Sequence, residues 1–168
     1  MKNVFLVACA MSLVFAGGCK NNKTLEPVKP TNIISLAEAQ TAVGDEYELE
    51  LQYDAVVDLG DNAYKATYIS TQLGAGDPVI VEVMYPSEEL SSSDIKKIYF
   101  SAYDNRVNKR KIKGIGSDAF VAFPTLSILE DGHLIRITAG SGDTKEQLDL
   151  LLALGNVAVN NLHEYLDV

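Results

Sequence analysis

Residues 119–138 read AFVAFPTLSILEDGHLIRIT, and this stretch decides the fold. It holds three apolar runs, at 119–123, 126–129 and 134–138, each of strand length. Residues 130–133 (EDGH), between the last two runs, have the composition of a hairpin turn. The stretch therefore predicts consecutive antiparallel strands.

Three further strands are predicted before this stretch. Over residues 46–53, apolar side chains alternate with Glu or Gln, which is typical of a strand with one buried and one wet face. Residues 63–69 (AYKATYI) predict the return strand. Residues 79–85 (VIVEVMY) predict a third strand, which ends at Pro86.

Helices flank and separate these two groups of strands. Ser35 and Glu38 fit a capping box at the start of a short helix. Ser91 begins a second helix, and its apolar residues recur at helical spacing. A further capping box at 144–147 opens a helix that runs to about residue 165.

The order of elements is therefore α-βββ-α-β(β)β-α, within a chain of 168 residues that suffices for one domain. Runs of strands joined by short turns favour the α+β class. We expect residues 34–168 to form a single α+β domain with an antiparallel sheet of five to six strands. The helices are expected to pack on one face of that sheet.

Composition excludes several classes of protein. There are 14 Lys and Arg residues against 23 Asp and Glu, and this net charge of −9 argues against a protein built to coat nucleic acid. Two Cys and two His residues are too few for a disulfide scaffold or a Cys/His-rich zinc site. No sequence motif indicates a catalytic set, a metal site or a cofactor, so none is expected.

Residues 1–18 predict a secretory signal peptide. Lys2 supplies a positive charge, and the apolar segment 4–16 is shorter than the roughly 20 residues needed to span a bilayer. The small residues 16–18 (AGG) before Cys19 resemble a bacterial lipobox, although Ala stands where Leu is usual. The resemblance implies cleavage before Cys19 and acylation of this residue, palmitate being one such chain. Ordinary cleavage near residues 16–18 is the alternative.

Residues 19–33 are predicted to be a lipidated tether that reaches up to roughly 40 Å. Removal of the signal would leave 13 basic and 23 acidic residues, a net charge of −10. The expected location is the extracytoplasmic side of the cell envelope, without a choice between inner and outer membrane. The membrane, through Cys19, is one expected partner, and an envelope protein or cell-wall component is another.

Residues 114–120 (GIGSDAF) resemble the GIGDEAF-like turn of small bacterial lipoproteins of unknown function. In that family a strand, a hairpin, a second strand and a closing helix rich in Leu and Ala follow. The matching segments here are 126–128, 132–133 and 148–162. An early helix ending at Gly44 is also similar, so the resemblance covers about residues 34–166. It implies a PsbP-like α+β domain without catalytic activity and supplies no functional residues, and the chain departs from the motif at Ser117.

Residues 106–113 reverse the local charge of this acidic chain. The five basic residues are Arg106, Lys109, Arg110, Lys111 and Lys113. They are candidates for contact with an anionic surface, either lipid headgroups or an acidic polymer. The structural alternative is that cations are favoured beside the C-terminus of the preceding helix.

Three weaker candidates remain. The glycine-rich segment 140–145 could bind an anion at a helix N-terminus, or it could simply be a tight turn. His133 and His163 have no evident partner in the sequence. The acidic residues that could bind calcium, or line a wet sheet face, are Glu46, Glu48, Glu50, Asp54, Asp58 and Asp61.

These observations predict a membrane-anchored extracytoplasmic lipoprotein whose domain is a non-catalytic interaction or ligand-binding module. Two alternatives stay open. One is a small envelope hydrolase that uses paired carboxylates. The other is an assembly factor that uses the wide apolar stripe of the last helix, which includes Leu150, Leu154 and Val157.

Overall fold

The computed structural model describes residues 27–52, 57–60 and 62–167, and these form four helices and eight strands. The helices are α1 (Pro30–Ile33), α2 (Leu36–Val43), α3 (Ser92–Asn105) and α4 (Lys145–Leu166). The strands are β1 (Leu49–Leu51), β2 (Val57–Asp58), β3 (Ala63–Ser70), β4 (Val79–Met84), β5 (Arg110–Ile112), β6 (Asp118–Ala122), β7 (Thr125–Glu130) and β8 (His133–Ala139).

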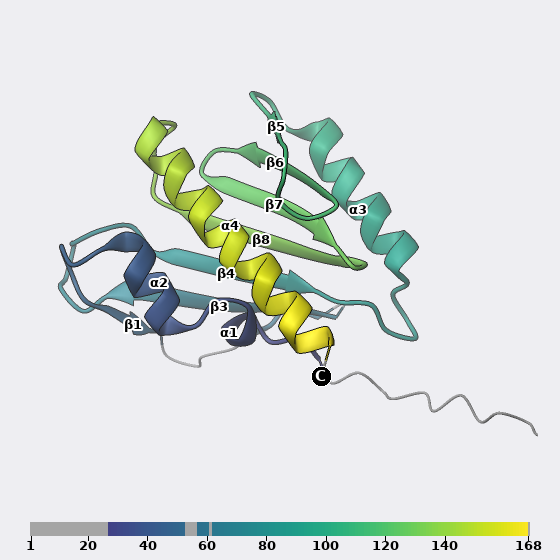
Figure 1. The fold of residues 1–168 in the computed structure, drawn as a ribbon, viewed down its shortest axis with the longest axis horizontal. Helices are drawn as coiled ribbons and strands as arrows, with labels where there is room; N and C mark the ends of the chain where they lie inside the picture. The colour runs from purple at the N-terminus through teal and green to yellow at the C-terminus, as the bar shows by residue number, and fades with distance from the viewer. Residues whose placement is uncertain (1–26, 53–56, 61, 168) are drawn as a thin grey trace, which may run out of the picture.

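All strands of the described residues join one antiparallel sheet (Figure 1). The order across the sheet is β1-β3-β4-β8-β7-β6-β5, and β2 pairs with β3. This arrangement confirms the predicted antiparallel α+β class. The sheet is larger than the expected five to six strands because β2 and β5 are added, and these short strands lack the apolar alternation that marks a strand in a sequence.

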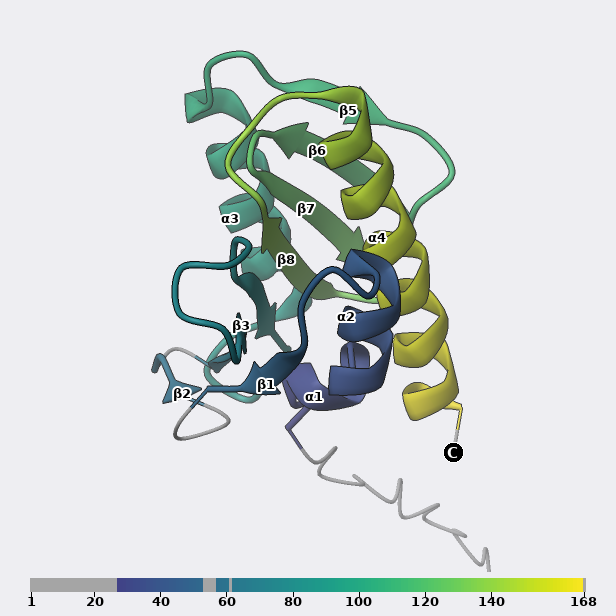
Figure 2. The same ribbon diagram turned by 90° about the vertical axis from the view of Figure 1, so that its left-hand side faces the viewer.

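Helices cover both faces of the sheet, so the prediction that they pack on one face is wrong (Figure 2). The cluster beneath α1, α2 and α4 includes Val81 and Ile137. On the opposite face, Tyr99 of α3 packs with Phe120 and Leu129. The physical reason is that β6 and β7 are apolar without alternation, so neither of their faces suits water and each needs a cover.

The predicted helix starts are found in the structure. The three N-caps are Ser35, Ser91 and Thr144. Ser35 forms the complete capping box, because its Oγ accepts from the Glu38 N–H at 3.3 Å and the Glu38 carboxylate accepts from the Ser35 N–H at 2.7 Å. Only the first half of the box forms at Thr144, because the Gln147 side chain donates instead to the carbonyl oxygen of Ala139.

Residues 28–33, predicted to be part of the tether, belong to the folded domain. Val28 is 2% exposed and Ile33 is fully buried. Asn161 of α4 donates its side-chain amide to the carbonyl oxygen of Ile33 at 3.0 Å. Burial of the apolar side chains in this segment stabilises the fold, so the folded domain includes Val28 and the residues that follow it.

The two ends of the molecule carry different features, as both ribbon views show (Figures 1 and 2). One end holds α1, near which the described residues begin, and the C-terminus of α4. The distal end holds the turn 106–109 before β5 and the loop 140–144 before α4. With 22 residues, α4 extends about 33 Å between these ends.

Candidate functional site

A groove of about 610 Å³ opens at the distal end. The residues that line it are Val107, Asn108, Lys109, Arg110, Phe123, Ser141, Gly142 and Asp143. The groove unites the basic stretch with the glycine-rich loop, which are separate candidates in the sequence. A hollow of about 630 Å³ is lined by residues of α3 alone. The distal groove is the stronger candidate because polar groups from several elements converge on it.

Two of the basic residues stabilise the fold. Lys109 Nζ donates to carbonyl oxygens at the C-terminal end of α3, at 2.6 Å from that of Tyr103 and 3.3 Å from that of Asp104. Lys111 Nζ lies 2.7 Å from both carboxylate oxygens of Asp118. The contacts of Lys109 are those expected of a cation beside a helix C-terminus.

Arg110 is the cation that the groove offers to a ligand. Its guanidinium carbon lies 5.4 Å from the centre of the Phe123 ring. Within residues 27–52, 57–60 and 62–167, no ion pair involves Arg110. Arg106 and Lys113 are exposed but do not line the groove. Contact of these residues with an anionic surface remains a prediction.

The glycine-rich loop forms the other side of the groove, and its sequence is explained by a tight turn. Gly140 has a φ of +69°, and a Cβ there would clash with the side-chain amide of Gln147. Thr144 caps α4 by accepting from the backbone N–H of Gln147. Anion binding by this loop is not needed to account for these residues and stays a prediction.

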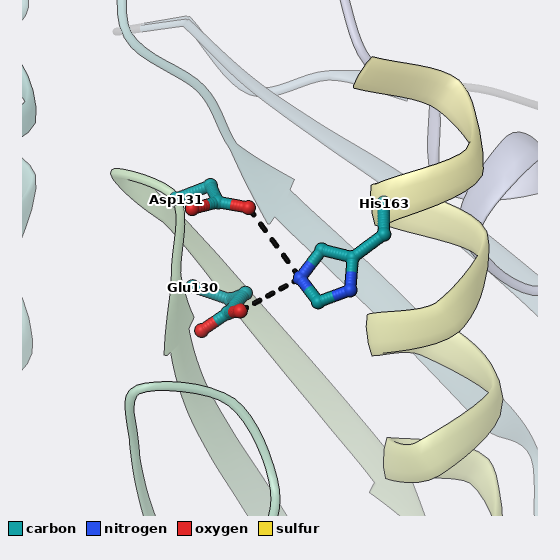
Figure 3. A group of neighbouring side chains, drawn as sticks. All are labelled: Glu130, Asp131 and His163. Atoms are coloured by element: carbon teal, nitrogen blue, oxygen red, sulfur yellow. Dashed lines mark hydrogen bonds and ion pairs between the residues drawn. The ribbon is translucent and has the colours of Figure 1, made fainter. Parts of the chain in front are cut away.

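A second polar cluster lies between the last turn of α4 and the β7–β8 hairpin, and it was not predicted from the sequence. We call Glu130, Asp131 and His163 the carboxylate–histidine cluster (Figure 3). His163 Nε2 lies 2.7 Å from Glu130 Oε1 and 3.4 Å from Asp131 Oδ2. His163, which has no evident partner in the sequence, therefore has two in the structure. Glu130 and His163 are 33 positions apart, so no local spacing links them in the sequence.

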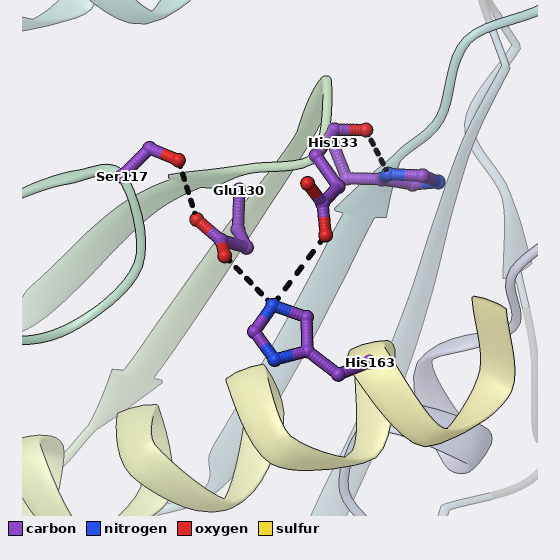
Figure 4. Close-up of polar contacts among 5 residues, drawn as sticks. Ser117, Glu130, His133 and His163 are labelled. Atoms are coloured by element: carbon purple, nitrogen blue, oxygen red, sulfur yellow. Dashed lines mark hydrogen bonds and ion pairs between the residues drawn. The ribbon is translucent and has the colours of Figure 1, made fainter. Parts of the chain in front are cut away.

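Ser117 holds the most buried member of this cluster. Its hydroxyl donates to Glu130 Oε2 at 2.6 Å (Figure 4). The Glu130 side chain is 12% exposed, against 45% for His163 and 54% for Asp131. Burial raises the pKa of the Glu130 carboxyl, but hydrogen bonds from Ser117 and His163 outweigh this effect, so its pKa lies below the ordinary value. The carboxylate is therefore charged at neutral pH.

His133 has a structural role next to the cluster. Its side chain is buried, and Nδ1 donates to the carbonyl oxygen of Asp131 at 2.9 Å. Burial lowers the pKa of His133, and the neighbouring Asp131 opposes this shift without reversing it. His133 therefore carries no charge at neutral pH and stabilises the hairpin.

The acidic residues in and around β1 and β2 form no comparable group among the residues that the structure describes. Glu46, Glu48, Glu50 and Asp58 are exposed, and Asp54 and Asp61 lie outside the described residues. In the described part of the chain, the carboxylate–histidine cluster is the one set of three or more potential ligands whose atoms lie within 4.8 Å of one another. The exposed glutamates fit the wet sheet face predicted as the alternative to calcium binding.

The last helix presents no exposed apolar stripe of the kind that an assembly factor would need. Leu154 is fully buried, and Leu150 and Val157 are half-buried. Among the described residues, no helix is both long and apolar enough to span a bilayer.

Comparisons with protein-family models, with curated proteins and with solved structures found no match to this chain.

Proposed function

We propose that this chain is a lipid-anchored protein of the bacterial cell envelope whose domain binds an acidic envelope component in the distal groove, without catalysing a reaction. The signal-like residues 1–18, followed by Cys19, support the anchor. Val28 is already buried in the core, so at most the nine residues 19–27 lie between the proposed anchor and the described domain. Nine extended residues reach at most about 30 Å.

The position of the groove carries this proposal. The tether would join the domain beside α1, at one end, and the loops 107–110 and 141–143 that line the groove lie at the other end, beside the start of α4. A short tether at one end favours orientations in which the opposite end faces away from the membrane. This placement favours an acidic polymer or protein over the lipid headgroups beneath the anchor.

The chemistry of the groove indicates the class of ligand. An arginine such as Arg110 forms paired hydrogen bonds with a carboxylate or phosphate. Its position over the Phe123 ring restricts the side chain and so favours a fixed geometry. Asp143, which also lines the groove, can accept from an N–H or O–H group. The groove therefore suits a carboxylate or phosphate beside a hydrogen-bond donor, as found in acidic peptides and acidic polysaccharides.

Site-specific photocrosslinking in cells tests the groove. A photoreactive residue replaces Val107, which is 83% exposed and lines the groove, or Glu164, an exposed residue near the C-terminal end of α4. We expect an adduct from position 107 that is lost in Arg110→Gln and absent from position 164. The same adduct at both positions, or one that survives Arg110→Gln, would refute the groove as the binding surface.

The anchor is tested separately by Cys19→Ser. The oxygen of serine does not receive the diacylglycerol, so the protein should move from the membrane fraction to the soluble fraction. An unchanged membrane fraction would show that Cys19 is not the anchor, whatever the groove binds.

A further inference from the structure

We propose that the carboxylate–histidine cluster is a binding site for a divalent transition-metal ion such as Zn²⁺, held by Glu130, Asp131 and His163. The site is remote from the distal groove and does not depend on the function proposed for it. Its three potential ligand atoms already lie within 4.8 Å of one another.

The spacing of the ligand atoms fits such an ion. Donors bound tetrahedrally to zinc at about 2.0–2.1 Å lie about 3.3–3.4 Å from one another. The distance from His163 Nε2 to Asp131 Oδ2 is 3.4 Å, so this pair needs no rearrangement. His163 Nε2 and Glu130 Oε1 are 2.7 Å apart and would separate by about 0.7 Å as the ion takes the place of the proton between them.

The ligands are positioned by rigid elements. Glu130 and Asp131 occupy the tight β7–β8 hairpin, and His163 projects from the last turn of α4 (Figure 3). Gly132 has a φ of +77° and lies close to Ser92 at the start of α3, where a Cβ would clash with the serine side chain. Ser117 occupies Glu130 Oε2 and leaves Oε1 directed at the histidine, the kind of supporting contact that metal sites use to orient a ligand.

The donor set selects the class of ion. One imidazole with two carboxylates suits zinc and its neighbours among the transition metals, whereas calcium prefers six to eight oxygen ligands. His163 and Asp131 are partly exposed, at 45% and 54%, so water can complete the coordination. The two negative charges of the carboxylates balance the charge of the ion.

Direct titration with Zn²⁺ tests the site. The full chain carries Cys9→Ser and Cys19→Ser so that no thiol competes, and Zn²⁺ is partitioned against a chromophoric chelator. A parallel Co²⁺ titration reports coordination through its visible absorption. We expect one ion per chain, with the binding constant weakened by about 10–100-fold in Ser117→Ala and at least as strongly in His163→Gln.

Asp131→Asn serves as the second ligand variant, because asparagine tolerates the φ of +44° at this position. It should also weaken binding and alter the Co²⁺ spectrum, and it decides the question if His163→Gln does not fold. Glu164→Gln is the matched control, since it removes an exposed acidic charge from the neighbouring position. Absence of saturable Zn²⁺ binding, unchanged binding in Asp131→Asn, or equal weakening in Glu164→Gln would each overturn the proposal.

Discussion

Asn161 joins the start of the fold to its last helix, and we expect Asn161→Ala to lower the free energy of unfolding by about 2 kcal/mol. Its side-chain amide donates to the carbonyl oxygen of Ile33 at 3.0 Å and to Glu38 Oε1 at 2.8 Å. These two contacts link α4 to residues that precede Asn161 by more than 120 positions. The substitution therefore tests whether residues 28–33 are part of the stable domain.

The magnitude follows from the two acceptors. A hydrogen bond to a neutral group contributes about 0.5–1.5 kcal/mol to stability, and one to a charged group about 1.5–3 kcal/mol. Ile33 is fully buried, so water cannot easily replace the lost donor at its carbonyl oxygen. Alanine in place of asparagine returns up to about 0.7 kcal/mol through its higher helix propensity. The balance is a net loss of roughly 2 kcal/mol.

Urea unfolding of the full chain, followed by circular dichroism, measures this loss. With a slope of about 2 kcal/mol per molar urea, the midpoint should fall by about 1 M. Asn160→Ala is the matched control, because Asn160 is exposed on the same helix and its replacement by alanine makes the same change in helix propensity. If the two variants agree within about 0.5 kcal/mol, the contacts of Asn161 do not stabilise the domain, and the assignment of residues 28–33 to it loses its support.

Two further predictions concern acid stability and the second core. Burial raises the pKa of Glu38, but hydrogen bonds from Asn161 and Ser35 outweigh this effect and lower it. The charged carboxylate therefore stabilises the fold above its unfolded pKa, and this stabilisation is lost as pH falls through its folded pKa. Glu38→Gln should reduce the change in urea midpoint between pH 6 and pH 3, and an unchanged difference would contradict this. Phe120→Ala should lower the free energy of unfolding by about 3–5 kcal/mol, because Phe120 is 2% exposed beneath α3. Phe100→Ala, at a residue that is 39% exposed, should lower it clearly less in the same urea assay. Equal losses of stability would argue against a core on that face of the sheet.

The antiparallel sheet could be predicted because its signals are local. The alternation at 46–53, the apolar runs and the turn at 130–133 each fall within a few neighbouring residues. The cover provided by α3 was missed because an apolar run without alternation shows that a strand is buried but not which helix buries it. Phe120 and Tyr99 meet on the second face through the fold, not through spacing in the sequence.

The candidate sites divide in the same way. Charge alone marks residues 106–113, but only the structure shows that Lys109 and Lys111 are engaged by the fold while Arg110 lines a groove. The carboxylate–histidine cluster has no local signal, since the hairpin and α4 bring its members together from separate parts of the chain. A pair of acidic residues in a turn and a histidine on a helix are each unremarkable until the topology joins them.

The length of α4 separates the two proposed sites. Lys145 at its start lies near the distal groove, and His163 lies 18 residues further along, so about 27 Å of helix stands between them. This distance exceeds the screening length of roughly 8 Å at physiological salt, and the two sites share no lining residue. Loss of the groove cation in Arg110→Gln should therefore leave Zn²⁺ affinity unchanged, and His163→Gln should leave crosslinking from position 107 unchanged. Coupling between the two sites would require a conformational change, because screened electrostatic interaction over this distance is too weak to connect them.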